Sequence, residues 1–190
     1  MKKQYVHKIQ EKILGLRVRG KVGQVYNYLF PHMYMKNYVQ YLRFLGVNLK
    51  GEPSYISCDV YFDGHDYSLI TIGSDVTISM GVTLLTHDYS IARGVEAVYG
   101  KKMWISEDTP YFLKPISIGD NCFVGAGSIL LPGTTLGKNC IIGSHAVVKG
   151  DIPDNSVVIG NPAKIVAKTT EWAERHMQLK DYYPPMRERD

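Results

Sequence analysis

Cysteine is scarce in this 190-residue sequence and long apolar runs are missing, and each shortage argues against a class of protein. The three cysteines, Cys58, Cys122 and Cys140, form no CxxC pair or Cys/His cluster, which disfavours a disulfide framework and a structural zinc site. No apolar run reaches the roughly 18 residues that a membrane span needs. The basic N-terminus lacks the apolar stretch and cleavage site of a secretory signal. We therefore expect buried free thiols in a cytoplasmic protein.

The sequence does contain an aliphatic residue at every sixth position over a long stretch. The clearest run is Ile118, Val124, Leu130, Leu136, Ile142 and Val148. Glycine follows four of these six residues, and a small residue stands four positions beyond most of them. An α-helix would repeat its apolar face every 3.6 residues and a strand every 2. A period of six instead predicts the coils of a hexapeptide β-helix.

Each hexad is expected to form one flat side of a triangular coil, so that three hexads complete a turn. The aliphatic residue points inward and stacks on its equivalent in the next coil, and glycine allows the turn that follows. Cys122 and Cys140 lie one such turn apart and should therefore stack as interior residues. Because each coil is stabilised by its neighbours, several coils and a cap at each end are needed.

The six-residue pattern, together with DIPDNSVVIGNPAKIV at residues 151–166, resembles the hexapeptide-repeat acyltransferases. The resemblance covers residues 56–168 and is greatest to bacterial sugar O-acetyltransferases such as the galactoside, maltose and polysaccharide enzymes. It implies an all-β, left-handed parallel β-helix and a homotrimer that binds acetyl-CoA in the groove between two subunits, without a metal. We expect a helical basic cap at residues 1–48, the β-helix at residues 49–168 and a C-terminal helix and tail at residues 169–190.

Two histidines are candidates for catalysis, because GHDYS at residues 64–68 and THDYS at residues 86–90 share four letters. His87 stands where the six-residue pattern breaks. The pattern resumes only at residues 116–118, which predicts a functional loop at residues 90–115. In the resembled family, a histidine at this place is the general base that takes the proton of the acceptor hydroxyl, a role that suits an imidazole. We interpret the repetition of HDYS as coincidence.

Contacts with the acceptor are expected from residues around His87. His65 follows the turn-forming pair Asp63-Gly64 and is either an exposed corner residue or an acceptor contact. The acceptor candidates are Asp63, His65, Asp88, Tyr89 and Trp104, while Tyr99 and Tyr111 either line the acceptor site or hold the loop in place. Asp88 is a poor candidate for orienting His87, because adjacent residues of an extended chain point to opposite sides.

The resemblance also implies positions for the oxyanion and for CoA. The negative oxygen of the transition state needs a preorganised donor, and the matching donor is the backbone N–H of Ala126. The matching CoA-binding positions are Gly125, Ala126, Ser144, Lys149, Gly150, Asn161, Pro162, Ala163, Lys164 and Lys168. Two positions depart from the family pattern. Gly150 replaces a lysine that often precedes the DIP motif, leaving Lys149 one residue earlier, and Lys168 substitutes for a basic residue that aligns with Ala167.

Acidic residues are almost absent from the first quarter of the chain. Residues 1–48 contain nine lysines and arginines but a single acid, Glu11, whereas the whole chain contains 22 basic and 18 acidic residues. A helix ending at Gly46 is predicted by the spacing of Tyr38, Tyr41, Leu42 and Leu45. We expect this segment to cap the solenoid, to contact the inner face of an anionic membrane, or to do both. No nucleic-acid motif accompanies it, so no nucleic-acid partner is expected.

We predict an acetyl-CoA-dependent O-acetyltransferase that acts on a hydroxyl of a sugar or glycan precursor in surface-polysaccharide assembly. The alternatives are an N-acetyltransferase acting on an amino sugar or nucleotide sugar, and an antibiotic acetyltransferase. A γ-class carbonic anhydrase would need three histidines around zinc, and His65, His87 and His145 lack the spacing of that family. An inactive scaffold is disfavoured by the presence of both His87 and the GNPAK motif.

Overall fold

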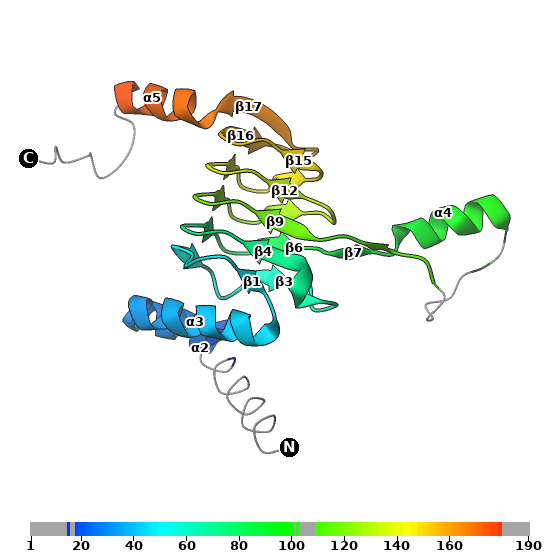
Figure 1. Ribbon diagram of the computed structural model, residues 1–190, viewed down its shortest axis with the longest axis horizontal. Coiled ribbons are helices and arrows are strands. Elements are labelled where there is room, and N and C mark those ends of the chain that lie inside the picture. The colour runs from blue at the N-terminus through cyan, green and yellow to red at the C-terminus, as the bar shows by residue number, and fades with distance from the viewer. Residues whose placement is uncertain (1–14, 16–17, 101, 103–108, 180–190) are drawn as a thin grey trace, which may run out of the picture.

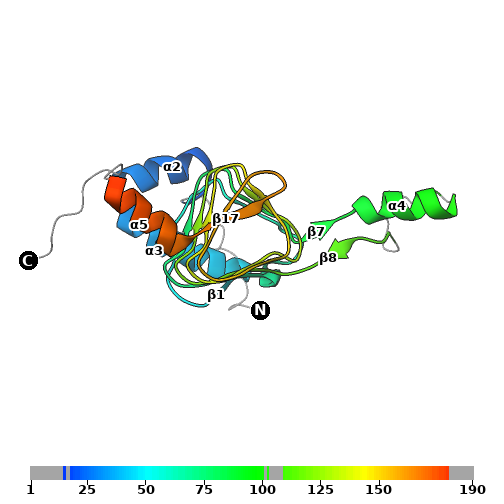
Figure 2. The same cartoon turned by 90° about the horizontal axis from the view of Figure 1, so that it is seen from above.

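The computed structural model describes residue 15, residues 18–100, residue 102 and residues 109–179. These residues form a parallel β-helix of stacked triangular coils, with helices at both ends and an arm that projects from one corner (Figure 1, Figure 2). The period of six residues therefore predicted the type of fold correctly.

Three flat faces, A, B and C, make up the coils, and the chain passes from A to B to C in each turn. Face A consists of β1 (Asn48–Leu49), β4 (Ile70–Ile72), β9 (Ile116–Ile118), β12 (Thr135–Leu136) and β15 (Asp151–Ile152). Face B consists of β2 (Tyr55–Ile56), β5 (Thr77–Ile78), β10 (Phe123–Val124), β13 (Ile141–Ile142) and β16 (Ser156–Ile159). Face C consists of β3 (Tyr61–Phe62), β6 (Thr83–Leu84), β11 (Ile129–Leu130) and β14 (Val147–Val148).

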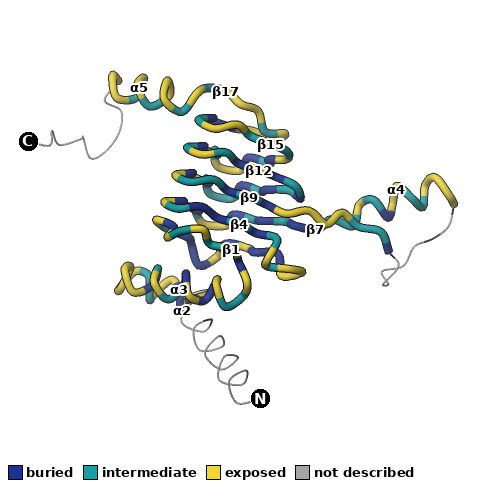
Figure 3. The backbone as a smooth tube through the Cα atoms, viewed as in Figure 1, coloured by how far each residue is buried: buried dark blue, intermediate teal, exposed yellow. Residues whose placement is uncertain are grey.

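Most of these strands are only two residues long, so their stability comes from pairing between coils and from the shared interior. All strand pairs between successive coils are parallel, for example Val124 with Ile142 and Leu130 with Val148. The aliphatic residues of the six-residue pattern are buried, and Figure 3 shows dark-blue, buried stretches of backbone recurring in successive coils. Cys58, Cys122 and Cys140 are buried free thiols, as predicted.

Helices cover the first end of the β-helix. They are α2 (Gly20–Leu29) and α3 (Pro31–Leu45), and α3 ends at Gly46, which has a left-handed backbone with φ of 101°. Tyr34 and Tyr38 of α3 are buried against the first coil, and the Tyr34 hydroxyl donates a hydrogen bond to the Ile56 carbonyl at 3.0 Å. Helices α2 and α3 therefore cover the first end of the solenoid.

The last coil is extended by β17 (Lys164–Lys168), which pairs antiparallel with β16, and by α5 (Thr169–Leu179). Midway along the chain, between β6 and β9, the arm consists of β7 (His87–Asp88), α4 (Ser90–Tyr99) and β8 (Phe112–Leu113). The sequence analysis predicted a loop here but not the helix α4. None of the helices in the described ranges is long and apolar enough to cross a membrane.

Removing one interior side chain should destabilise the whole stack. Leu130 is fully buried on face C, so Leu130→Ala is expected to lower the free energy of unfolding by about 2–5 kcal/mol through lost burial and a residual cavity. Thr135→Ala, at an exposed outward position of face A, is the control and should change it by about 0.5 kcal/mol or less. Equal losses in denaturant unfolding of the two variants would contradict the inward stacking.

Candidate active site

His87 lies at the corner between faces C and A, the CA corner, where the arm leaves the coil. Its side chain is 27% exposed. It is the first residue of β7, and β7 pairs antiparallel with β8, so that His87 faces Leu113 and Asp88 faces Phe112. The arm therefore begins at His87, the residue that the sequence predicts to be the general base.

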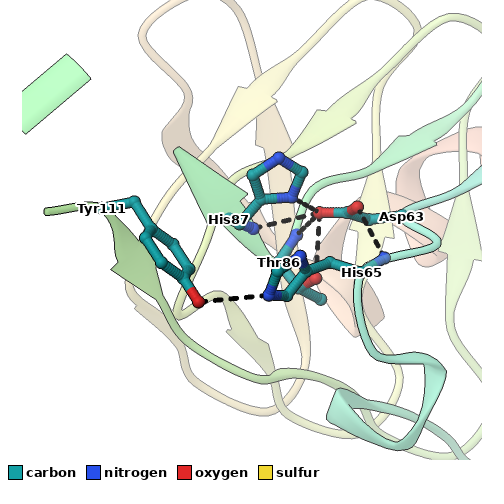
Figure 4. Close-up of polar contacts among 5 residues, drawn as sticks. All are labelled: Asp63, His65, Thr86, His87 and Tyr111. Atoms are coloured by element: carbon teal, nitrogen blue, oxygen red, sulfur yellow. Dashed lines mark hydrogen bonds and ion pairs between the residues drawn. The ribbon is translucent and has the colours of Figure 1, made fainter. Parts of the chain in front are cut away.

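Asp63, from the coil below, orients this histidine (Figure 4). Asp63 Oδ2 lies 2.5 Å from His87 Nδ1, and it also accepts hydrogen bonds from the His87 N–H at 3.0 Å and from the N–H and hydroxyl of Thr86, both at 2.9 Å. Because a carboxylate can only accept, Nδ1 carries the proton, and Nε2 is left with a free lone pair. This is the tautomer that a general base requires.

The Asp63 carboxylate is buried beneath His87 and stays charged. Burial alone would raise the pKa of Asp63, but hydrogen bonds from the Thr86 N–H, the His87 ring, the Thr86 hydroxyl and the His65 N–H together lower it below the ordinary value of 3.8. Sequence analysis placed Asp63 among the acceptor contacts. In the structure the buried carboxylate contacts Thr86, His87 and His65, an arrangement that fits a positioning role for Asp63 beside His87.

His65 lies beside His87 rather than at an isolated corner. The two ring centroids are 5.3 Å apart, and His65 Nε2 is 3.2 Å from the hydroxyl of Tyr111. Tyr89 completes a closed set of four rings, with centroids 5.6 Å from His87 and 4.9 Å from Tyr111. We call these four residues, His65, His87, Tyr89 and Tyr111, the aromatic cluster. It contains both histidines of the repeated motif.

The repetition of HDYS is therefore structural, and our interpretation of it as coincidence was wrong. Residues of β3 pair with residues of β6 that lie 22 positions later, for example Tyr61 with Thr83, and the two histidines are also 22 positions apart. In both copies the aspartate accepts a hydrogen bond from the serine N–H two residues on, Ser68 at 2.9 Å and Ser90 at 2.7 Å. Each copy starts a helix, η1 (Tyr67–Leu69) in the first and α4 in the second.

The residues expected to bind the acyl donor fall into two columns along the coils. Lys149 and Gly150 lie at the CA corner, above His87, because they join β14 to β15. A pocket at this corner is lined by Asp88, Phe112, Lys114, Leu131, Pro132 and Lys149. The second column, at the corner between faces B and C, comprises Gly125, Ala126, Ser144, Asn161, Pro162 and Ala163.

The BC corner offers free backbone donors. None of the hydrogen bonds recorded for the described residues uses the N–H of Ala126 or Ser144 as donor. Gly125 is buried here, and a Cβ on it would lie 2.6 Å from the Ile142 carbonyl oxygen, so this glycine is required by the close approach of the next coil. Ala126 and His87 occupy different corners, so one chain does not bring them together.

The remaining candidates are more scattered. Lys164 follows Ala163 directly and begins β17 at the BC corner, whereas Lys168 pairs with Ser156 at the opposite end of that strand. Tyr99 is exposed at the end of α4, which projects away from the coil (Figure 2). Trp104 lies outside the described residues. Within the described ranges, no group of three or more His, Cys, Asp or Glu side chains is arranged to hold a metal ion.

Sequence reasoning missed the part played by Thr86 and Lys114. Thr86 is fully buried and supplies two of the hydrogen bonds to Asp63. The sequence signal for Thr86 was its position. It is a polar residue directly before His87, at a point where the chain still follows the coil. Lys114 follows β8, and its N–H donates to the Thr86 carbonyl at 2.9 Å, but nothing in its sequence neighbourhood pointed to this contact.

Comparison with known proteins agrees with this architecture. A family model described as bacterial transferase hexapeptide (six repeats) matches residues 115–150. Protein CapG of Staphylococcus aureus is 36% identical over 141 residues, which make up 74% of this chain and 77% of CapG. The galactoside O-acetyltransferase of Escherichia coli (strain K12) is 30% identical over 117 residues, or 62% of this chain and 52% of that enzyme. The matched region thus spans about half of the galactoside enzyme.

A solved structure of a galactoside acetyltransferase in complex with coenzyme A also resembles this chain. It aligns with a TM-score of 0.57 at 19% sequence identity, covering 96% of this chain and 86% of that one. At this level of identity the likeness concerns the fold, which is the left-handed parallel β-helix.

Asp63 should make the stability of the protein depend on pH. Its pKa is lowered in the folded state, so its stabilising contribution is complete above the unfolded value of about 3.9 and is lost as the pH falls through the lowered folded value. Asp63→Asn should therefore be less stable than the wild type above about pH 4, and the difference should shrink in stronger acid. Thr86→Val keeps the carboxylate but removes one of its hydrogen-bond donors, so it should show the same pH dependence in weaker form. A difference that is constant with pH in urea unfolding would contradict the charged state of Asp63.

Proposed function

Because the chain belongs to the hexapeptide-repeat acyltransferases, we propose that it transfers the acetyl group of acetyl-CoA to a hydroxyl of a sugar or glycan precursor. The observation that carries this proposal is the buried Asp63–His87 pair, which leaves His87 Nε2 as a free base at an open corner. The match of residues 115–150 to the bacterial transferase hexapeptide model supports a transferase, and the name of the galactoside O-acetyltransferase supports a sugar hydroxyl as acceptor.

In the proposed reaction, His87 Nε2 takes the proton of the acceptor hydroxyl while the oxygen attacks the thioester carbonyl carbon. The Asp63 carboxylate stabilises the imidazolium that forms. When the tetrahedral intermediate collapses, the carbon–sulfur bond breaks and the proton passes from Nε2 to the leaving thiolate. No covalent intermediate with the protein is needed, since both substrates can be held at the same corner and proximity supplies part of the rate.

The aromatic cluster suits a sugar acceptor beside His87. Tyrosine and histidine rings combine an apolar face with a polar edge, and a sugar likewise combines apolar C–H faces with hydroxyl groups. His65 and Tyr111 are joined by their hydrogen bond, so this side of the site is held in place before the acceptor binds.

We further propose that the active unit is a homotrimer, in which the BC corner of one subunit lies opposite the CA corner of the next. The Ala126 N–H would then stabilise the oxyanion formed beside a neighbour's His87. The outward residues of the three faces support this arrangement. The outward residues of face A are all polar: Asn48, Thr71, Ser117, Thr135 and Asp151. Those of faces B and C are mostly aromatic or aliphatic: Tyr55, Phe123, Ile141, Tyr61, Ile129 and Val147, beside Thr77 and Thr83. Apolar faces are the ones expected to be covered by another subunit.

Loss of His87 should affect the chemical step, and loss of His65 should affect acceptor binding. His87→Ala is expected to lower kcat by about 10²–10⁴-fold, with CoA affinity unchanged. His65→Ala should lose far less kcat and should raise the acceptor KM, because it removes contacts shared by the ground and transition states. Steady-state kinetics with acetyl-CoA and a panel of sugars, including amino sugars, measures both. Similar kcat losses in two folded variants, or acetylation of the amine alone, would contradict the proposal.

Mixed trimers test whether two chains build one site. Ser144 is exposed at the BC corner, so Ser144→Trp should block that corner while leaving His87 intact. Ser144→Trp and His87→Ala should each be inactive alone. Unfolded and refolded together in equal amounts, they should recover about a quarter of wild-type activity, because a site is intact when a subunit with His87 meets a neighbour with an open BC corner. No recovery in a mixture that sedimentation shows to be trimeric would contradict the shared site.

A further inference from the structure

The two helices that cap the β-helix leave an apolar stripe uncovered on their outer side. Val22, Val25 and Leu29 follow one side of α2 at helical spacing and are 61%, 59% and 57% exposed. Phe30 and Met33 continue the apolar surface at the junction with α3, and each is more than half exposed. We call these five residues the outer stripe. A contiguous apolar surface of this kind on a helix indicates a binding partner.

The surroundings of the outer stripe contain basic residues, and the two helices contain no acidic ones. On α3, the exposed positions His32, Lys36, Gln40 and Arg43 follow one another at helical spacing, and Lys21 is exposed on α2. No aspartate or glutamate occurs in the sequence between Glu11 and Glu52. Glu52 lies on the first coil, where it pairs with Arg43 at 2.6 Å, and so the two helices carry no negative charge of their own.

The inner side of the same helices is fully occupied by the cap. Asn37 donates a hydrogen bond to the Tyr26 hydroxyl at 2.8 Å, and Asn27 donates one to the Tyr55 hydroxyl of the first coil at 2.9 Å. The helices are therefore fixed on the coil by these contacts and by buried tyrosines, and the outer stripe is not needed for capping. Its exposure calls for a second function.

We propose that the outer side of α2 and α3 is a docking surface for an anionic lipid bilayer. A helix that lies in the membrane interface buries an apolar face among the acyl chains and places basic residues at the headgroups, and each lysine or arginine near an anionic surface adds to the attraction. The outer stripe and the flanking Lys21 and Lys36 have this combination. An exposed aromatic residue, Tyr28, lies beside them and suits the interface as well.

The position of the surface relates it to the active site. Figure 1 shows α2 and α3 lying across the first end of the coils, opposite α5. Asp63 follows β3 of the first coil and His87 follows β6 of the second, so His87 is on the order of 20 Å from the outer side of the helices. A glycan carried by a lipid in that membrane would therefore be within reach of His87. This consequence rests on the proposed function, while the membrane docking does not.

The proposed trimer would strengthen the attachment. A three-fold rotation leaves the height of each subunit along the symmetry axis unchanged, so all three outer surfaces would face the same way. Once one surface is bound, the other two are held close to the bilayer at a high effective concentration. Weak binding by a single copy is then sufficient for stable attachment of the assembly.

Vesicle co-sedimentation of the full-length protein tests the proposal. The protein should sediment with phosphatidylcholine vesicles that contain phosphatidylglycerol, and at least about tenfold more weakly with phosphatidylcholine alone or at high salt. The double variant Val25→Glu/Leu29→Glu should bind the anionic vesicles at least about tenfold more weakly than the wild type. Met177→Glu/Leu179→Glu on α5 changes two exposed apolar residues at the other end of the coils and should bind as the wild type does.

Several results of these experiments would contradict the membrane proposal, and they can be told apart. Equal sedimentation with both vesicle types, no sedimentation, or equal loss in both double variants would overturn the proposal. A change of oligomeric state in Val25→Glu/Leu29→Glu, with no lipid binding by the wild type, would assign the stripe to a second copy of the chain. Acetyl transfer from acetyl-CoA is measured alongside, both to soluble sugars and to a glycolipid carried in the vesicles. Its absence with both acceptors would overturn the proposed function without affecting the membrane result.

Discussion

Every functional position in this protein depends on the requirement that successive coils stack in register. Ile70 pairs with Ile116, and Ile72 with Ile118, although the whole arm lies between them in the sequence. An extra residue inside a strand would turn its inward side chain outward, so additional chain can be accommodated only at a corner. The arm therefore leaves and re-enters the coil at the CA corner. Its first strand, β7, carries His87 at the point where the chain stops contributing to the interior.

The same constraint explains the geometry around the histidine. The CA corner of the first coil is lengthened by η1, and this sets the 22-residue offset between β3 and β6 that brings His65 beside His87. Asp63 comes directly after β3, still close to the coil axis, and is buried. A buried carboxylate would be costly without partners, and Thr86 and His87 supply them from the coil above. Stacking of two coils thus fixes the tautomer of the histidine before any substrate is present.

The parts of the structure that sequence predicted are those that repeat. The six-residue period predicted the β-helix and its buried residues, and the break in that period predicted the point at which the arm leaves the coil, at His87. The part played by Asp63 was missed because it depends on a contact between coils of unequal length, which a regular period does not reveal. The repeated HDYS was misinterpreted for the same reason, since its spacing of 22 does not fit a turn of three hexads. The helix α4 was missed although Ile91, Val95 and Val98 have helical spacing, because one helical face in a short segment is a weak signal.

A single chain holds the two halves of the proposed site on separate corners, and the physical chemistry of each half fits that separation. At the CA corner, the proposed base His87 is oriented by the buried carboxylate of Asp63 in its own chain. At the BC corner, the N–H groups of Ala126 and Ser144 form none of the recorded hydrogen bonds of the described residues, which costs little at an exposed corner because water can accept from them. When a neighbouring subunit covers the corner in the proposed trimer, those donors lose water and become available to a developing oxyanion in a medium of lower polarity, where each hydrogen bond is stronger. Assembly would then complete the site without any rearrangement of the coils themselves.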